Sequence, residues 1–445
     1  MVKQLYSIFL IFALNVILAQ EDGPIPLNLD KGGDVLTYAH PSEVGLDSSY
    51  IHSEVSKIIT NSIKKKAFPG AQVLVAKNGK IIFHQAYGYH TYDSIRAVAL
   101  NDIYDLASVT KITAALPALM KLVDEGVLDL DQAFSTYWKP WRKRKDKRDI
   151  TLRQILAHQA GLEPYIVLLN TVRKKNGTLK KRFVRTKPNP RFRRRAYDNI
   201  YVKSRFIKKA HRLIDRSQVS DKKSYRYSGL AFLIFPDLIQ QLTGQSFSEY
   251  LQSNFYGPIG LNTVNFNPKL KSYTNFIVPT EQDSTFRKAL THAWVHDENA
   301  ALLGGVSGNA GLFASATDLA QLMQMYLQYG VYNGKRYFSK AVIEEFTRVQ
   351  FPENDNRRGL GFDKPLLNNA ELALSKAYPA PEVSPDSFGH SGFTGTFVWA
   401  DPENQLVYIF LSNRVYPSRS HRQIYDLNIR PAVQQVFYQA RLAIE

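Results

Sequence analysis

Residues 106–126, LASVTKITAALPALMKLVDEG, combine an apolar helical pattern with a serine and a lysine three positions apart. Residues at i and i+3 share one face of a helix, so this spacing predicts that the side chains of Ser108 and Lys111 meet. A neutral lysine amine could then take the proton of the serine hydroxyl, which is a poor nucleophile without a base. For that role, burial or a neighbouring cation must lower the lysine pKa from about 10.4.

The same spacing also has a purely structural interpretation. Ser108 stands where the helix is expected to begin, so its hydroxyl could simply cap an exposed helix start. Pro117 is expected to bend the run, because proline inside a helix costs about 3 kcal/mol. It lies two turns beyond Lys111, so the first turn can remain regular. The spacing alone leaves both interpretations open.

Two strand pairs are predicted near opposite ends of the chain. AQVLVAKNGKIIFHQAYG (71–88) predicts a hairpin turning at Asn78-Gly79, because a tight primed turn needs positive φ at both central residues. GTFVWADPENQLVYIFLSNR (395–414) repeats the pattern, and helical periodicity dominates between the two pairs. We therefore predict an α/β (α+β) fold, in which an antiparallel sheet flanked by helices carries an inserted, mainly helical domain.

The predicted boundaries divide the chain into a leader and two structural units. Residues 1–20 hold Lys3 and an apolar stretch shorter than the roughly 20 residues of a membrane-spanning helix, which predicts a signal peptide; a retained anchor is the alternative. Residues 21–135 and 300–445 are assigned to the sheet domain and 136–299 to the insertion. The chain contains no cysteine, which excludes disulfides, a lipidated cysteine and thiolate metal ligands. Export without disulfides favours a periplasmic location, where the protein could associate with the cell envelope.

The formal net charge of +18 is concentrated in two stretches. Residues 171–226 contain 21 Lys and Arg against three Asp and Glu, and residues 139–148 contain seven against one. Clustered cations with interleaved aromatics are typical of nucleic-acid binding, but an exported protein seldom meets nucleic acid, so we expect no such partner. We expect the basic lobe, residues 171–226, to attract an anionic envelope surface or anionic substrates; a solvated variable insertion is the alternative.

Two further segments hold residues suited to hydrolysis. YRYSGLAFLIF (225–235) places Tyr227 at the start of a helical pattern, where a phenol could relay a proton to a leaving group. FGHSGFTGTFVW (388–399) places four residues at the head of a predicted strand, whose glycines would let a substrate lie against the strand edge. Taken singly, Tyr227 could instead be a half-buried core aromatic, and His390 could be an ordinary loop residue. The four residues of the second segment are His390, Ser391, Gly392 and Phe393.

These three segments, in this order, resemble the penicillin-recognising serine hydrolases, the branch that includes class C β-lactamases, D-alanyl-D-alanine carboxypeptidases and related esterases. The resemblance extends from GLDSSYIHSEVSKII (45–59) to IFLSNRVYP (409–417). The block VHDENAALLGGVSGNAGLF (295–313) is similar to envelope carboxypeptidases and to the β-lactamase-type module fused behind some family 3 glycosidases. The resemblance as a whole implies a β-lactamase/DD-peptidase-like fold.

The resemblance also implies roles for individual residues. Ser108 would be the acylated nucleophile, Lys111 its base and Tyr227 a proton shuttle. His390, Ser391 and Gly392 would line the cleft as the third motif of the family. The backbone N–H groups of Ser108 and Phe393 would form the oxyanion hole, where one donor is worth about 3 kcal/mol.

Two departures from the family pattern concern the substrate. The second motif usually ends in Asn or Asp, but here Gly229 provides no side chain to hydrogen-bond the substrate and the lysine. His390 replaces the usual lysine, and with an ordinary pKa near 6.5 it is expected to be only partly charged at neutral pH. Both changes weaken the case for β-lactam turnover and favour an esterase or a weak peptidase.

No cofactor or metal is expected. His292 and His296 are four residues apart, but the run lacks the glutamate spacing of a zinc protease. His158 is expected to brace the helical unit. We expect an exported serine hydrolase that cleaves an ester or amide, such as a peptidoglycan-derived D-Ala peptide, a β-lactam or a small-molecule ester. The alternative is a non-catalytic envelope or peptidoglycan-binding protein that retains the fold.

Overall fold

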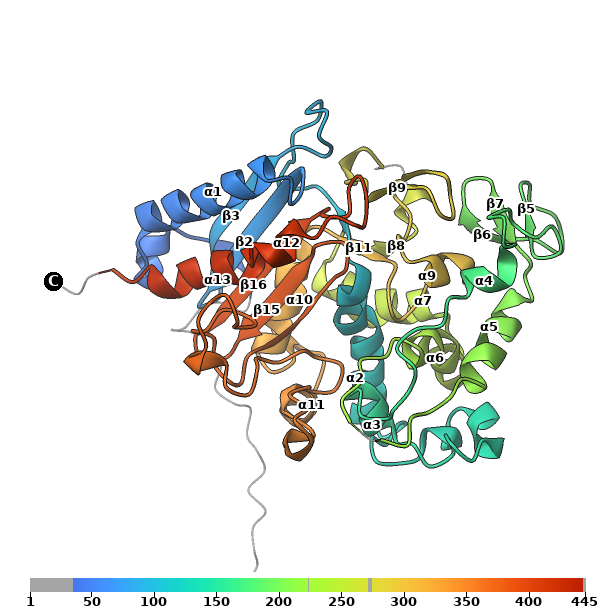
Figure 1. Ribbon diagram of the computed structural model, residues 1–445. Coiled ribbons are helices and arrows are strands. Elements are labelled where there is room, and N and C mark those ends of the chain that lie inside the picture. The colour runs from blue at the N-terminus through green and yellow to red at the C-terminus, as the bar shows by residue number, and fades with distance from the viewer. Residues whose placement is uncertain (1–34, 223, 271–273, 443–445) are drawn as a thin grey trace, which may run out of the picture.

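The computed structural model describes residues 35–222, 224–270 and 274–442, and its main element is a six-stranded sheet (Figure 1). Only the outer strand β1 runs parallel to its neighbour; the other adjacent strands are antiparallel. Strands from both ends of the chain therefore form one sheet, as predicted. In spatial order they are β1 (Thr37–Tyr38), β3 (Lys80–Gly88), β2 (Gly70–Lys77), β16 (Leu406–Ser412), β15 (Phe397–Asp401) and β14 (Phe388–Ser391).

Both faces of the sheet are buried, because successive side chains of β2 point into different hydrophobic clusters. Val73 and Val75 pack with residues of α1 (Ser48–Lys64) and α13 (Ile429–Gln439). Leu74 and Ala76 pack with residues of α2 (Leu116–Asp124) and α10 (Ala316–Leu327). The β2–β3 turn has φ of 52° at Asn78 and 75° at Gly79, as the hairpin prediction requires. The sheet domain thus has three layers, helix, sheet and helix.

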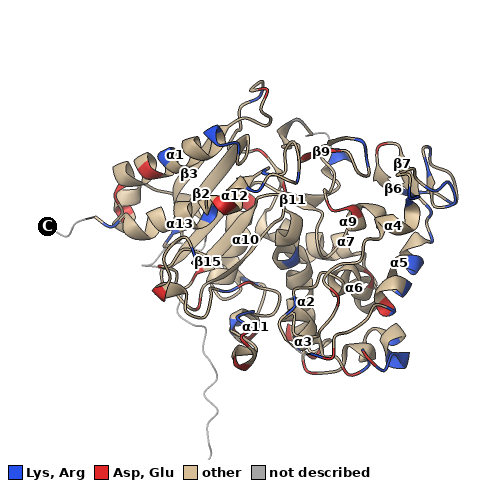
Figure 2. Ribbon diagram, viewed as in Figure 1, with Lys and Arg blue, Asp and Glu red and all other residues tan. Residues whose placement is uncertain are grey.

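The middle of the chain forms a second, mainly helical region, drawn in green and yellow beside the sheet in Figure 1. Residues of the basic lobe add a small sheet in the order β5-β7-β6, and Val184, Val202 and Phe206 join the main hydrophobic cluster. Lys and Arg gather around these strands (Figure 2). The elements here are α3 (Leu152–Leu156), α4 (Leu169–Val172), β5 (Val184–Arg185), β6 (Arg194–Tyr197), β7 (Ile200–Val202), α5 (Phe206–Asp215), α6 (Phe235–Thr243), α7 (Phe247–Leu251), α8 (Gly257–Ile259), β9 (Glu281–Asp283), β10 (Ala289–Thr291) and α9 (Glu298–Leu302).

A short sheet leads the chain into the Ser-x-x-Lys segment. Strand β4 (Tyr104–Asp105) pairs with β11 (Leu312–Ala314), which also pairs with β8 (Asn265–Phe266). The expected single helix is instead a 3-10 turn over Ala107–Val109, a π turn over Lys111–Ala115 and then α2. Pro117 lies in this continuous helical run just after the π turn, and the carbonyls of Ile112 and Thr113 one turn before it accept from the hydroxyls of Tyr326 and Tyr256, each at 2.8 Å.

The remaining elements are peripheral to the site: β12 (Val331–Tyr332), β13 (Lys335–Arg336), α11 (Lys340–Thr347) and α12 (Gln423–Asp426). Among the described residues, none of the helices has the length and apolar character needed to span a bilayer. The predicted signal peptide, residues 1–20, lies outside the described residues.

Candidate active site

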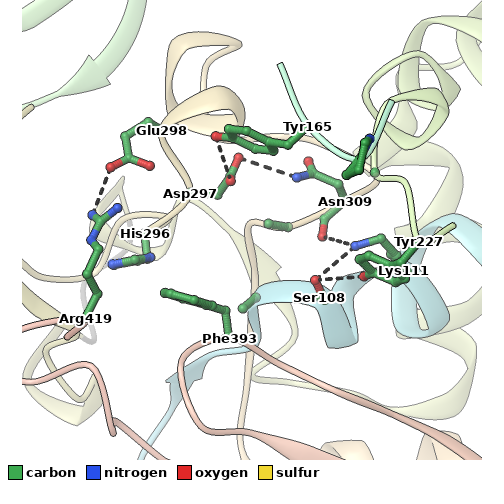
Figure 3. Close-up of a pocket in the computed structure, with 14 residues that line it drawn as sticks. Ser108, Lys111, Tyr165, Tyr227, His296, Asp297, Glu298, Asn309, Phe393 and Arg419 are labelled. Carbon is green, nitrogen blue, oxygen red and sulfur yellow. Dashed lines mark hydrogen bonds and ion pairs between the residues drawn. The ribbon is translucent and has the colours of Figure 1, made fainter. Parts of the chain in front are cut away.

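The hydroxyl of Ser108 and the amine of Lys111 meet, as their spacing predicts (Figure 3). Lys111 Nζ donates to Ser108 Oγ at 3.0 Å and to the carbonyl oxygen of Asn309 at 3.2 Å. The lysine is only 2% exposed, and within the described part of the chain it forms no ion pair. A buried amine whose hydrogen-bond partners are all neutral is suited to exchange a proton with the hydroxyl beside it.

Tyr227 approaches the same hydroxyl from the helical region. Its OH donates to Ser108 Oγ at 3.2 Å. Burial favours the neutral phenol, but the positive charges of Lys111 and Arg358 outweigh that effect and lower the Tyr227 pKa. The amine of Lys111 and the guanidinium of Arg358 each lie 5.2 Å from the centre of its ring. The phenol is therefore biased toward losing its proton, as a shuttle requires.

His158 holds the Tyr227 segment in place. Its ring lies 4.5 Å from the Tyr227 ring, and its Nδ1 accepts a hydrogen bond of 3.3 Å from the backbone N–H of Ser228. Its carbonyl accepts another, of 2.9 Å, from the N–H of Arg226. Burial, with Arg358 and Lys111 nearby, lowers the His158 pKa well below the ordinary value, so the ring is a neutral acceptor. The sequence-based prediction of a bracing histidine fits these contacts.

The backbone just before the nucleophile has an uncommon conformation. Ala107 has a φ of 46°, in the left-handed region that residues with a Cβ adopt at a cost. Its N–H donates to Asp105 Oδ1 at 2.9 Å, and Asp105 Oδ2 accepts from the N–H of His296 at 2.6 Å. The Asp105 carbonyl accepts from the hydroxyl of Thr394 at 2.7 Å. Asp105, which sequence reasoning missed, thus joins the backbone before Ser108 to the segments of His296 and Thr394.

The third predicted segment is divided between the pocket and the core. Phe393 is 47% exposed and lines the pocket, whereas His390, Ser391 and Gly392 do not belong to its lining. A Cβ on Gly392 would lie 2.4 Å from the carbonyl oxygen of Leu106, so glycine permits this close approach of two backbones. Of the four residues predicted to bind the substrate, the structure places Phe393 on the pocket lining, and a role for the other three stays a prediction.

His390 is not the partly charged group that its sequence context predicts. It is buried in β14, and its Nδ1 lies 2.7 Å from the carbonyl oxygen of Ser391. Burial, followed by the positive charges of Arg358 and Lys111, lowers its pKa to about 3. The histidine is neutral at physiological pH and supplies no cation to a substrate.

The pocket is a cavity of about 340 Å³ between the sheet and the helical region. Ser108, Lys111, Tyr227 and Phe393 form one side (Figure 3). The opposite side is mostly polar, and most of it comes from the block 295–313, one of the segments that carry the family resemblance. Its labelled residues are Tyr165, His296, Asp297, Glu298, Asn309 and Arg419.

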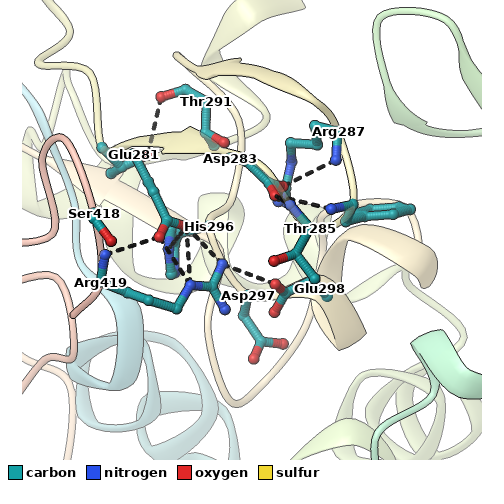
Figure 4. A network of polar contacts seen from close by, with 12 residues as sticks. Glu281, Asp283, Thr285, Arg287, Thr291, His296, Asp297, Glu298, Ser418 and Arg419 are labelled. Carbon is teal, nitrogen blue, oxygen red and sulfur yellow. Dashed lines mark hydrogen bonds and ion pairs between the residues drawn. The ribbon is translucent and has the colours of Figure 1, made fainter. Parts of the chain in front are cut away.

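Arg419 supplies the cation of this opposite side, and two glutamates compensate its charge (Figure 4). Its Nη2 lies 2.6 Å from Glu281 Oε2 and 2.8 Å from Glu298 Oε1. Burial opposes ionisation of Glu281, but His296 and Arg419 outweigh it and hold its pKa well below the usual range. His292 and His296, which sequence analysis did not expect to bind a metal, have different partners: His292 Nε2 lies 2.9 Å from the carbonyl oxygen of Ile277, and His296 contacts Glu281.

Asn309 faces the position where the second motif lacks a side chain. A Cβ on Gly229 would have only the Cβ of Asn309 within 4 Å, at 3.9 Å. The Asn309 amide is oriented by Ser307, whose hydroxyl donates to Oδ1 at 2.7 Å. Sequence reasoning missed Asn309, although its loop belongs to the block 295–313 that carries the family resemblance.

Comparisons with known proteins identify the family. The Beta-lactamase family profile matches residues 55–430. A protein of Salmonella gallinarum named "Putative D-alanyl-D-alanine carboxypeptidase" is 32% identical over 412 residues, which cover 85% of this chain and 86% of the relative. The solved structure of EstCE1, described as a hydrolase with promiscuous acyltransferase activity, superposes with a TM-score of 0.61 at 18% identity and covers 86% of this chain and 98% of its own. A penicillin-binding protein homologue from Caulobacter crescentus gives 0.60 at 16% identity, with coverage of 88% and 99%. The chain belongs to the beta-lactamase family, and it is a serine hydrolase of that family.

Proposed function

We propose that this protein is an exported hydrolase that cleaves a carboxylic ester or an amide through an acyl-enzyme formed on Ser108. The observation that carries the proposal is the convergence of Lys111 and Tyr227 on one hydroxyl, at 3.0 and 3.2 Å from Ser108 Oγ. A binding protein has no need for a base and a phenol on the same serine. The carboxypeptidase name of the Salmonella relative and the hydrolase activity of EstCE1 support the same class of reaction.

The contacts assign a step to each group. The amine of Lys111 takes the proton of Ser108 while Oγ attacks the substrate carbonyl carbon. The backbone N–H groups of Ser108 and Phe393, both on the pocket lining, would hold the resulting oxyanion. Tyr227 then passes a proton to the leaving group, which departs as an alcohol or amine. Water attacks the acyl-enzyme and releases the acid, with the same two groups moving protons in reverse.

The charges around the pocket favour an ester or neutral amide over a substrate that must be held by a free carboxylate. His390 is neutral, and Arg419 is held between Glu281 and Glu298. Recognition of a β-lactam or a D-Ala-D-Ala terminus by a cation would require one of these groups to change partners. We therefore place carboxylic esters and amides without a free carboxylate first. Peptidoglycan-type peptides and β-lactams, which carry a carboxylate, come second.

Covalent labelling tests the proposal directly. The wild-type protein and Ser108→Ala are treated with a fluorophosphonate probe and with a fluorescent penicillin. We expect an adduct that depends on Ser108, and faster turnover of a 4-nitrophenyl ester than of nitrocefin or a D-Ala-D-Ala peptide. Absence of any Ser108-dependent adduct with either probe would overturn the acyl-enzyme and favour the envelope-binding alternative.

We also propose that the basic lobe holds the enzyme near an anionic surface of the envelope. Many exposed cations of the lobe form no ion pair within the described ranges, and five of them lie just before or just after β5, where Lys and Arg gather in Figure 2. Binding to anionic vesicles or sacculi should weaken as salt rises, because exposed charges are screened. The variant Arg191→Glu/Arg193→Glu should bind less than Lys64→Glu/Lys65→Glu, a matched change at the end of α1. Equal binding by both variants, or no salt dependence, would contradict this proposal. The five cations are Lys181, Arg182, Lys187, Arg191 and Arg193.

A further inference from the structure

Asp297 is a carboxylate on the pocket lining whose hydrogen-bond partners are all neutral. Its Oδ1 accepts from the N–H of Ala300 at 2.8 Å and from the side-chain amide of Asn309 at 3.4 Å. Its Oδ2 accepts only a long contact of 3.5 Å from the hydroxyl of Tyr165. Figure 3 shows the carboxylate between these two side chains, on the side of the pocket opposite Ser108. Oδ2 therefore retains the capacity to accept a strong hydrogen bond from a ligand.

The neighbouring acids differ from Asp297 in this respect. Glu298 lies 2.8 Å from the guanidinium of Arg419, and Glu281 lies 2.6 Å from the same group (Figure 4). Within the described residues, no lysine, arginine or histidine lies within ion-pair distance of Asp297. Of the two acids on the pocket lining, Asp297 and Glu298, Asp297 is thus the one without a cationic partner among the described residues.

The environment of Asp297 is unfavourable to an isolated charge. Burial raises its pKa, and the nearby charge of Glu298 acts in the same direction. A cation bound in the pocket would offset both effects, because an opposite charge at short distance favours the ionised carboxylate. A substrate carboxylate would add a third negative charge to this side of the pocket.

We infer that Asp297 binds an ammonium group of the substrate, so that the enzyme acts on esters or amides that carry a free amine or a quaternary nitrogen. The inference rests on the proposed function of Ser108 and adds the substrate class. Asp297 and Ser108 line one cavity of about 340 Å³, which accommodates a small substrate that reaches both. The ammonium can belong to the acyl group, as in an aminoacyl ester, or to the alcohol, as in a choline ester.

Two pairs of esters test the inference and distinguish these positions. Alanine benzyl ester is compared with its N-acetyl counterpart, and butyrylcholine with 3,3-dimethylbutyl butyrate, which replaces the charged nitrogen by carbon. We expect the wild type to prefer the ammonium member of at least one pair in kcat/KM. Asp297→Asn should reduce that preference by roughly tenfold or more, the equivalent of one charge-assisted hydrogen bond.

Glu298→Gln is the matched control, because it removes one negative charge from the same side of the pocket at a position that Arg419 already compensates. Its effect on the preference should be clearly smaller. Asp297 also caps α9, so Asp297→Ser, which can cap as well, is measured beside Asp297→Asn, with thermal melting of each.

Several outcomes would overturn the inference. One is an unchanged preference in both Asp297 variants, and another is an equal loss in Glu298→Gln, which would indicate a general electrostatic effect. Labelling of Ser108 by the fluorophosphonate without preference for either ammonium ester would overturn the inference while leaving the proposed nucleophile intact. Failure of labelling would instead overturn the proposed function.

Discussion

The amine of Lys111 lies 3.2 Å from the backbone carbonyl oxygen of Asn309, so a loop more than 190 residues further along the chain holds the base of the site. Its other hydrogen-bond partner is the hydroxyl of Ser108 at 3.0 Å. No carboxylate of the described chain forms an ion pair with this amine.

Lys111→Arg should lower kcat/KM for a 4-nitrophenyl ester by a factor of about 100 to 10,000, the range of general acid–base catalysis. A guanidinium keeps the positive charge but does not release its proton. Lys121→Arg is the control, because Lys121 pairs with Glu125 on the outer part of α2. Activity of Lys111→Arg close to that of this control would show that the amine is not the base.

The predictable parts of the fold are those with local signals. Asn78-Gly79 fixed the first hairpin because both residues adopt positive φ, and the Ser-x-x-Lys spacing gave the central contact of the site. The 3-10 and π turns around Ser108 have no such signal, since the helical pattern of 106–126 is equally compatible with a regular helix. Tertiary contacts decide the local geometry there.

The parts of the site that sequence reasoning missed come from distant segments. Asp105, Asn309 and Arg358 carry no motif of their own, and they act through partners that only the folded chain brings near. The neutral state of His390 has the same origin, because burial and the cations of Arg358 and Lys111 lower its pKa. A spacing rule describes neighbours along the chain and contains no information on burial.

The pH profile should depend on Arg358, because its charge lowers the Tyr227 pKa against the opposing effect of burial. Arg358→Met should raise that pKa, so the falling limb of kcat/KM, where the phenol loses the proton that it passes to the leaving group, moves to higher pH. Arg358→Lys keeps the charge and should shift the limb less. Asp363, which also lies 3.4 Å from Arg358, keeps Arg357 as an ion-pair partner at 2.9 Å in both variants. Superimposable profiles for Arg358→Met and the wild type would rule out this electrostatic role.

Two glycines near the site should respond in opposite ways to alanine. Gly229→Ala meets only Asn309 within 4 Å, at 3.9 Å, so stability should change by less than about 0.5 kcal/mol. Gly392→Ala would place a Cβ 2.0 Å from the hydroxyl of Thr396 and 2.4 Å from the Leu106 carbonyl oxygen. It should lower the free energy of unfolding by about 1–3 kcal/mol and displace the strand from Ser108. Chemical denaturation measures both, and equal stability of the two variants would contradict the prediction.

Stability should decline as the pH falls below about 6.5, in part because His390 is buried in its neutral form. Its pKa is about 3 in the folded protein, so between these values the unfolded chain binds a proton that the folded chain does not. The stabilisation is present above the ordinary histidine pKa and is lost toward acid, by up to about 1.4 kcal/mol per pH unit for one group. His84, with a pKa lowered to about 4 by burial, acts in the same direction.

His390→Gln isolates the contribution of one histidine to that decline. The free energy of unfolding, measured from pH 7.5 to 4.5, should depend less steeply on pH in this variant than in the wild type. His40→Gln serves as the control, because His40 is exposed. Equal slopes for His390→Gln and the wild type would show that His390 is protonated in the folded protein as readily as in the unfolded chain.

Asp105 should be needed for both stability and turnover, because its two oxygens accept from the N–H groups of Ala107 and His296 at 2.9 and 2.6 Å. Asn at this position offers one acceptor oxygen and an NH₂ group, so Asp105→Asn leaves one buried N–H without a partner, at a cost of about 1–3 kcal/mol. Ala107 then loses part of what holds its left-handed conformation, and the Ser108 hydroxyl is less well positioned, so kcat should fall more than KM rises. Asp149→Asn, at an exposed site paired with Arg148, is the matched control. A stable Asp105→Asn variant with unchanged kcat would show that the backbone before Ser108 does not depend on this carboxylate.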